Sequence, residues 1–230
     1  MPTFSQIKPV SLREQVAAQI RTAIIEGQLK PNDHVVEASL TQQLGVSRTP
    51  VREALILLER EALIVSVPNR GAFVRAFNEQ DVWAIFTMRT ALENFAAELI
   101  IERMTAGDIT HLEHLIDIQH RYIEQNDLKR VRSTDMSFHQ YLVDLSDHPL
   151  LKRSWQEIVA QIAAVLYVRA EGFGSYDEFQ ATRDHQAIVE AYRACDLERV
   201  RYENKRINNR VAQECAQAIE QLNRQLNGTK

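Results

Sequence analysis

The apolar residues in the first part of the chain recur at the spacing of a helix and then stop. The stripe lies within 12–26 and consists of Val16, Ile20, Ala23 and Ile24. Ser11 is a natural N-cap for this helix, and Gly27 is suited to end it. Turn-forming residues then fill 29–33, and we expect residues 1–9 to be a short lead.

Residues 36–63 have the pattern of two short helices joined by a tight turn. Apolar residues recur at helical spacing in the first helix: Val36, Leu40 and Leu44. Gly45 offers the left-handed backbone that ends a helix, Ser47 is an N-cap, and Pro50 falls in the first turn of the next helix. That second helix continues through Leu63 and exposes Arg48, Thr49 and Arg52 at its start. This layout is a helix-turn-helix whose second helix enters the major groove of DNA.

A hairpin follows the helix-turn-helix. The β-branched run 64–67 and the segment 72–74 flank Pro68, Asn69, Arg70 and Gly71, which are turn formers or polar. Helix, helix-turn-helix and hairpin together predict a winged helix-turn-helix over residues 1–76, with Arg70 at the tip of the wing.

Every later segment has a helical pattern. The first stripe of the second domain consists of Val82, Ile85, Phe86, Leu92, Phe95 and Leu99. Asn78 and Thr105 are plausible N-caps, and the segment 172–175 breaks the pattern. The helices end near 104, 125, 146, 169, 194 and 226. We therefore predict a mainly α protein in which residues 77–230 form an all-α, six-helix domain.

The net charge is informative only when the two parts of the chain are counted separately. The formal net charge is −4, which is unusual for a DNA-binding protein. Residues 1–75 carry nine basic and seven acidic side chains, however, and the remainder carries eighteen and twenty-four. A positive module beside an acidic one suits local contact with DNA, whose strength falls with salt.

Two cysteines, Cys195 and Cys215, form no metal-binding or redox motif and fit reduced thiols. The segment Met1–Val10 has no signal-peptide pattern, and no apolar run approaches the length of a membrane span. We expect a cytoplasmic protein without membrane contact.

The chain resembles the GntR family of bacterial transcription regulators, and its second half resembles the FCD type of effector domain. The first half matches through Pro31, through Leu40, the run from Leu44 to Leu55, and the segment from Arg70 to Val74. The second half matches through Arg89 and Glu93, through Asp135, Phe138 and His139, and through His185, Ile188, Ala191 and Asp196. The resemblance covers almost the whole chain.

The resemblance assigns DNA contacts to Arg48, Thr49, Arg52 and Arg70. Arginine suits this role because it pairs with guanine through two hydrogen bonds or clamps a phosphate. Many relatives place an arginine early in the first helix of the motif, where Ala38 stands here. One phosphate or base contact is therefore missing.

A candidate metal site comes from Asp135, His139 and His185. Asp135 and His139 share one helix face at i and i+4, and His185 lies on a later helix. The resemblance implies a divalent metal of the Zn, Ni or Mn class. In metal-binding relatives a third histidine stands at the position of Ile207, so the set of metal ligands is incomplete here. Asn204 or Asn208 could contribute weakly. Waters or effector oxygens would fill the remaining coordination positions. Alternatively, the three residues form a hydrogen-bonded polar pocket without metal.

Effector binding is the prediction for Arg89 and Asn208. An inward-facing Arg89 needs a partner, because an unpaired buried charge is costly. That partner is either Glu93 or the carboxylate of a small organic acid. By the resemblance, such effectors include sugar acids and hydroxy- or dicarboxylic acids. Some relatives bind long acyl-CoA without metal, which the Asp135, His139 and His185 set argues against. His111, His114 and His120 fit a solvated helix face.

These features predict a homodimeric, effector-responsive transcription regulator, a repressor by the resemblance, that reads an inverted-repeat operator in double-stranded DNA. Two alternatives remain. One is a small metal-dependent enzyme with an appended DNA-binding head, although no nucleophile motif or glycine-rich loop accompanies the cluster. The other is a constitutive dimeric DNA binder without an effector.

Overall fold

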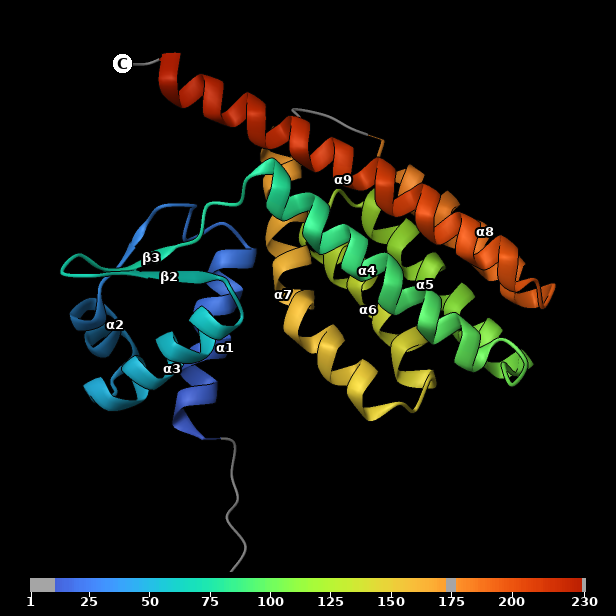
Figure 1. Ribbon diagram of the computed structural model, residues 1–230, viewed down its shortest axis with the longest axis horizontal. Coiled ribbons are helices and arrows are strands. Elements are labelled where there is room, and N and C mark those ends of the chain that lie inside the picture. Colours follow the sequence, from blue (N-terminus) through green and yellow to red (C-terminus); the bar gives the residue numbers. More distant parts are fainter. Residues whose placement is uncertain (1–10, 173–176, 229–230) are drawn as a thin grey trace, which may run out of the picture. The chain divides into compact units, whose positions relative to one another are not determined.

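The computed structural model describes residues 11–172 and 177–228, and its contacts divide the chain into two units, Met1–Ala76 and Phe77–Lys230. Within residues 11–76, the first unit contains three helices and a small sheet (Figure 1). Its elements are α1 (Leu12–Ile25), β1 (His34–Val35), α2 (Glu37–Leu44), α3 (Arg48–Arg60), β2 (Ile64–Val67) and β3 (Gly71–Val74). The predicted lead at 1–9 lies outside the described residues.

The core of the first unit forms where α3 packs on α1, α2 and the sheet. Apolar side chains from these elements are buried: Val16, Ile20, Ile24, Val51, Leu55, Leu58, Leu63, Ile64 and Val74. Gly45 adopts φ 64° and ends α2, as its place in the sequence predicted. Because α3 shows its apolar face to this core, its other face is left to solvent.

The sheet contains one strand that the sequence did not predict. Strand order is β1-β3-β2, and both pairs are antiparallel, with His34 opposite Phe73 and Val65 also opposite Phe73. β1 is two residues long, so no alternation of polar and apolar residues could reveal it. It forms because β3 offers it a free edge.

Two predicted helix limits in this unit are wrong. Val36 is the N-cap of α2 and is 43% exposed, so it does not belong to a buried stripe. α3 ends at Arg60, because Ala62 takes a left-handed conformation (φ 54°), and Leu63 enters the core from the following turn. Ser47 occupies the predicted N-cap of α3 but makes no side-chain capping bond.

The second unit consists of six helices and no strand within its described residues. They are α4 (Glu79–Ile100), α5 (Ala106–Glu124), α6 (Leu128–Leu145), α7 (Pro149–Gly172), α8 (Phe179–Arg193) and α9 (Leu197–Gly228). Most of the break predicted at 172–175 lies outside the described residues. The mainly α class, with a winged helix-turn-helix followed by a helical domain, is confirmed.

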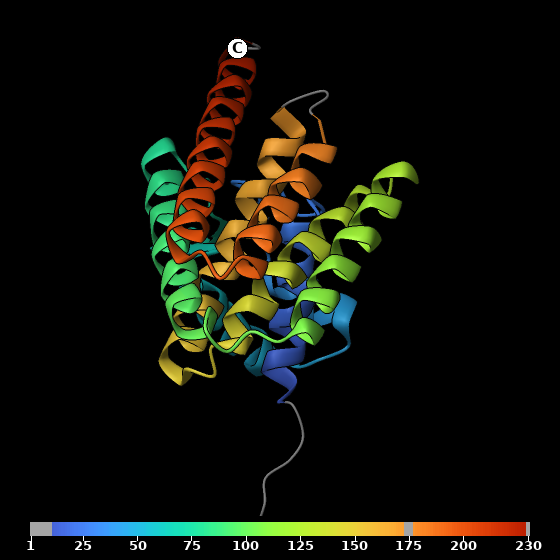
Figure 2. The same cartoon turned by 90° about the vertical axis from the view of Figure 1, so that its right-hand side faces the viewer.

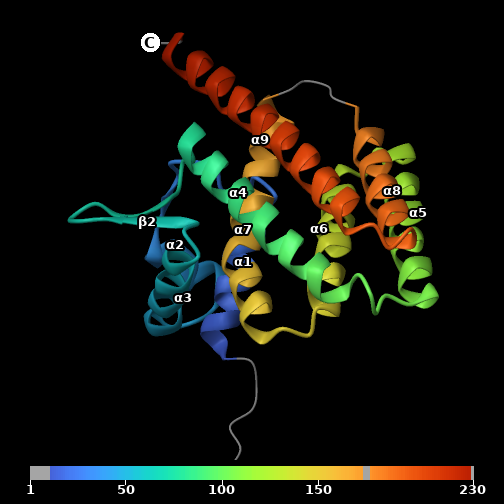
Figure 3. The same ribbon diagram turned by 45° about the vertical axis from the view of Figure 1, so that its right-hand side comes forward.

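α4 packs against α6, α7 and α9. Figures 1 and 2 both show α9 lying along α4, and Figure 3 shows α8 beside α5. The two predicted N-caps are confirmed: Asn78 Oδ1 accepts from Asp81 N at 2.9 Å, and Thr105 Oγ1 accepts from Asp108 N at 3.2 Å. Phe95, predicted in the core stripe of α4, is instead 39% exposed.

Candidate functional site

The start of α3 forms one candidate site. Arg48, Thr49 and Arg52 are all exposed on the face opposite the buried residues of this helix. Arg52 Nε lies 2.9 Å from Glu37 Oε2, so an acidic side chain of α2 holds this arginine. Ala38, also on α2, is exposed and offers no charge. The face therefore presents two guanidinium groups and one hydroxyl at a helix N-terminus, as binding of DNA in its major groove requires.

Arg70 lies at the tip of the β2–β3 hairpin. Its backbone N donates to Val67 O at 3.0 Å, which closes a turn in which Asn69 has φ 61°. The guanidinium carbon of Arg70 lies 5.8 Å from the centre of the Phe73 ring, and His34 stacks on the same ring at 4.8 Å. The wing-tip arginine is thus exposed but held against an aromatic platform.

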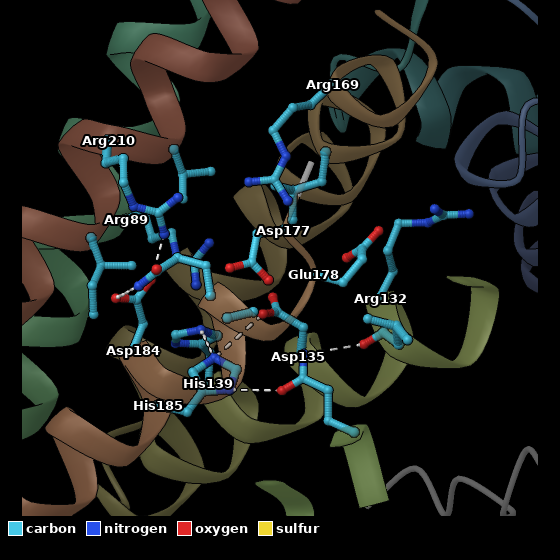
Figure 4. A pocket seen from close by; sticks show the side chains of 17 residues that line it. Arg89, Arg132, Asp135, His139, Arg169, Asp177, Glu178, Asp184, His185 and Arg210 are labelled. Carbon is cyan, nitrogen blue, oxygen red and sulfur yellow. Dashed lines mark hydrogen bonds and ion pairs between the residues drawn. The ribbon is translucent and has the colours of Figure 1, made fainter. Parts of the chain in front are cut away.

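The second candidate site lies inside the helical unit, and its three potential metal ligands come from two helices. α6 supplies Asp135 and His139, α8 supplies His185, and one potential ligand atom from each of the three lies within 4.8 Å of the other two. Both histidines are 3% exposed, whereas Asp135 is partly open to a pocket. The structure therefore brings together the three residues that the sequence grouped (Figure 4).

The Nδ1 atom of each histidine lies at hydrogen-bonding distance from an oxygen that can only accept a hydrogen bond. His139 Nδ1 lies 2.9 Å from Glu93 Oε1, and His185 Nδ1 lies 3.0 Å from Gln119 Oε1. Both Nδ1 atoms must therefore carry the donated proton. The remaining Nε2 atoms point toward one another at 3.2 Å, and His185 Nε2 is 3.3 Å from Asp135 Oδ1. This arrangement has the second layer of hydrogen bonds that is typical of metal-binding histidines.

Charge state follows from the surroundings of these groups. Burial and the positive charge of Arg89 lower the pKa of His139 despite the acidic residues beside it, so this ring is neutral at pH 7. Burial opposes the ionisation of Asp135, but its hydrogen bond to His185 and the positive charge of Arg89 hold its pKa well below the ordinary value. One potential ligand atom from each of Asp135, His139 and His185 therefore faces a common point, where a cation could be held.

Arg89 and Glu93 form a buried ion pair beside this cluster, as one of the two sequence interpretations proposed. Arg89 Nε donates to Glu93 Oε1 at 2.8 Å, and both side chains are at most 5% exposed. Asn208 Nδ2 donates to Glu93 Oε2 at 2.7 Å and to Thr90 Oγ1 at 3.1 Å. Burial alone would raise the pKa of Glu93, but Arg89 and His139 hold it at about 2.

A small pocket joins these groups. It is lined by Arg89, Asp135, His139, His185 and Ile207, among others, whereas Asn208 lies outside the lining, at 1% exposure. Ile207, at the position where relatives carry a third histidine, contributes an apolar wall. Asn204 donates to Asn94 Oδ1 at 3.0 Å and does not line the pocket.

The sequence did not reveal the two residues that accept hydrogen bonds from the histidines of this site. Glu93 was assigned only to Arg89, yet the same oxygen also accepts from His139. Gln119 was not singled out, although it is a polar residue within the buried stripe of α5 that Leu112, Ile116 and Ile123 define. A buried amide at helical spacing among apolar residues is a signal that could have revealed it, because such a group needs a partner.

The other histidines lie away from the pocket. His111, His114 and His120 are exposed on α5, as predicted. His148, to which no role was assigned, accepts from Leu151 N through Nδ1 at 3.1 Å at the start of α7. Of the helices in residues 11–172 and 177–228, none combines the length and the apolar character that a membrane crossing requires.

Comparison with known families gives two matches along the chain. Residues 12–74 match the model of bacterial regulatory proteins of the gntR family, and residues 84–210 match the FCD domain. The transcriptional regulator YdhC of Bacillus subtilis (strain 168) is 31% identical over 160 residues, which cover 69% of this chain and 71% of YdhC. The gluconate operon transcriptional repressor of Bacillus licheniformis is 26% identical over 185 residues, covering 79% of this chain and 76% of the repressor.

A solved structure shares the fold. The structure of Escherichia coli McbR/YncC superposes with a TM-score of 0.76 at 23% identity, covering 93% of this chain and 99% of that one.

Proposed function

The chain belongs to the bacterial GntR family of regulatory proteins and carries an FCD domain, and from that membership we propose that it is a homodimeric repressor whose DNA binding is released by a small carboxylic acid. Membership of the family makes it a transcription regulator. The observation that carries the finer proposal is the pocket in which Arg89 meets the converging acceptors of Asp135, His139 and His185.

DNA is read by the exposed start of α3 in this proposal. Arg48, Thr49 and Arg52 contact base edges or phosphates in the major groove, and Arg70 contacts the adjacent minor groove or backbone. Two such heads related by a two-fold axis would read an inverted repeat. The support is that Arg48, Thr49 and Arg52 are exposed on one face of α3 and that Arg70 is exposed at the tip of the wing.

Replacement of Arg52 by alanine tests the DNA contact. We expect Arg52→Ala to weaken specific binding by about 1–3 kcal/mol if the side chain reaches a base edge. Arg60→Ala is the matched control, since Arg60 is exposed at the other end of the same helix. Binding would be measured by fluorescence anisotropy on a DNA sequence selected from a random pool. Equal affinity of Arg52→Ala and the wild-type protein would contradict the assignment.

A divalent cation fits the acceptor cluster. Metal–nitrogen bonds are about 2.0–2.1 Å, so two histidine nitrogens on one ion lie about 2.9–3.4 Å apart, and the observed separation is 3.2 Å. Arg89 and Glu93 neutralise each other, which leaves one negative charge on Asp135. Asp135, His139 and His185 would hold the ion, which would offer a positive charge to an effector oxygen.

Metal content tests this part. We expect a near-stoichiometric divalent ion in the purified protein and in His114→Ala, whose histidine is exposed on α5, but not in His139→Ala. Elemental analysis after dialysis would measure it. An ion-free wild-type protein would favour the alternative interpretation, in which the three residues form a hydrogen-bonded polar pocket without metal.

The effector carboxylate is assigned to Arg89. Only Nε of this side chain is engaged by Glu93, and no described residue accepts from its two terminal nitrogens. Such a pair suits a carboxylate that accepts two parallel hydrogen bonds. Asn208 has an indirect part, because it donates to Glu93 Oε2 and Glu93 in turn accepts from Arg89.

Arg89→Lys tests the effector contact while keeping a positive charge. We expect organic acids to raise the melting temperature of the wild-type protein and to lower its affinity for DNA, and to do neither in Arg89→Lys. By linkage, effector and DNA must change each other's affinity by the same factor. If no acid changes DNA affinity, the second domain serves only to join two DNA-binding heads.

A further inference from the structure

Of the two arginines at the start of α3, Arg52 is held by a neighbouring side chain. Its Nε donates to Glu37 Oε2 at 2.9 Å. In the described part of the chain, no acceptor engages the two terminal nitrogens of Arg52, and none engages Arg48. The side chain of Arg52 is 63% exposed and that of Glu37 is 38% exposed, so DNA can reach this pair. Glu37 thus restrains the guanidinium group without covering it.

The position of Glu37 is set by the helix that carries it. Glu37 is the first residue of α2, where the positive end of the helix dipole favours a carboxylate. Because α2 packs on α3 (Figure 1), the separation of Glu37 and Arg52 is fixed by two packed helices. Ala38, the next residue, offers no charge, and Arg52 is the one cation among the described residues that pairs with Glu37. The pair is therefore a feature of the folded first unit.

The atom that Glu37 engages limits how Arg52 can bind DNA. An arginine recognises guanine when two parallel N–H donors face O6 and N7 of the base. With Nε occupied by Glu37, the two terminal nitrogens of Arg52 remain, and they form such a pair of donors. An unrestrained arginine can turn toward a phosphate instead, a contact that carries no sequence information. The bond to Glu37 removes much of this freedom from the long side chain of Arg52.

The charge of Glu37 also reduces binding to incorrect sequences. Together the two side chains carry no net charge, so the pair contributes little to the sequence-independent attraction of the phosphates. Where the base is not guanine, Arg52 can regain affinity through a phosphate only by giving up its bond to Glu37. Specificity is a difference between two affinities, and it increases when the alternative contact is made unfavourable.

We propose that Glu37 is a positioning residue for DNA recognition, which directs Arg52 to a guanine in the major groove and away from the phosphates. Arg52 makes the base contact, and Glu37 acts through Arg52 without touching DNA. This inference rests on the proposed DNA contact of Arg52.

Base preference, rather than affinity alone, provides the test. A binding sequence is selected from a random pool with the full-length protein, and the base pair whose preference is lost in Arg52→Ala is the Arg52 position. Fluorescence anisotropy gives the dissociation constants for the intact site and for the site with the guanine replaced. A two-bond contact with guanine discriminates by roughly five- to 150-fold, and Glu37→Ala should lower the measured ratio by about three-fold or more. Binding of Glu37→Ala to unrelated DNA should become tighter and more dependent on salt, because the freed Arg52 can reach a phosphate.

Glu53→Ala is the matched control. Glu53 is exposed on α3, next to Arg52, and no described residue pairs with it. Its removal changes the net charge by the same amount, so binding to unrelated DNA should also tighten, whereas the base preference should keep the wild-type ratio. The double variant Glu37→Ala/Arg52→Ala should show the same ratio as Arg52→Ala, because Glu37 acts only through Arg52.

The outcomes separate this inference from the proposed function. An unchanged ratio in Glu37→Ala, with the preference lost in Arg52→Ala, would overturn the role of Glu37 and leave the DNA contact of Arg52 standing. A further loss of preference in the double variant would mean that Glu37 touches DNA itself, which also overturns the positioning role. If Arg52→Ala keeps the wild-type preference at every base pair, the proposed contact fails, and the inference fails with it.

Discussion

Replacement of Glu93 by glutamine should destabilise the helical domain, because it leaves the charge of Arg89 buried without a partner. Breaking such a pair by removing one member costs about 3–5 kcal/mol. The pKa of Glu93 gives a similar figure independently. A carboxyl whose pKa is held at about 2 instead of the ordinary 4.5 contributes about 3 kcal/mol at pH 7, at 1.36 kcal/mol for each tenfold change.

The same helix provides a matched control. Glu98 is also on α4 and pairs with an arginine, Arg201, at 2.5 Å, but both side chains are well exposed. Exposed ion pairs contribute about 0–1 kcal/mol. Glu98→Gln should therefore change the free energy of unfolding by less than about 1 kcal/mol, while Glu93→Gln lowers it by about 3.

Tryptophan fluorescence makes the measurement specific to the helical domain. The two tryptophans of the chain, Trp83 and Trp155, both lie in the second unit, and Trp155 is fully buried. Unfolding by urea would be followed at one protein concentration, in the presence of a metal chelator. Equal stability of the Glu93→Gln and Glu98→Gln variants would refute the reasoning.

The pH dependence adds a second readout. Because the folded pKa of Glu93 is lowered, its contribution is present above the unfolded pKa and is lost as pH falls from about 4.5 toward about 2. The difference in stability between wild type and Glu93→Gln should thus be constant near neutral pH and shrink in acid. A difference that grows in acid would contradict the assigned direction.

Two further predictions concern packing and thiol chemistry. A Cβ atom at Gly172 would lie 2.6 Å from the Cβ of Ala218 on α9, so Gly172→Ala should cost about 1–3 kcal/mol of stability in urea unfolding. Gly107→Ala, whose Cβ would meet nothing closer than 3.5 Å, should not. Burial raises the pKa of the Cys215 thiol to about 12, whereas Cys195 is exposed. A thiol reagent should therefore modify one cysteine in the native protein and both after unfolding. Rapid reaction of both cysteines in the native protein would contradict the buried position of Cys215.

Local signals in the sequence carry much of this fold. The glycine at 45 ends α2 with a left-handed backbone, and Asn78 and Thr105 cap their helices through residues three positions later. These devices act over a few neighbouring residues, so they can be recognised without knowledge of the rest of the chain. The features that the sequence did not predict depend on distant contacts. β1 exists only as a partner of β3, and Leu63 is buried although its helix has ended.

The candidate site likewise has a part that the sequence predicts and a part that depends on tertiary packing. Asp135 and His139 could be grouped from their spacing alone, because residues four apart share one helix face. The position of His185 beside them, and the use of one Glu93 oxygen by both Arg89 and His139, are decided by the packing of α4, α6 and α8. A sequence states which groups are available. Only the tertiary structure decides which of them are desolvated together. The contacts of the buried Glu93 with Arg89 and His139 lower its pKa, and the packing of α9 places Ile207 in the wall of the pocket.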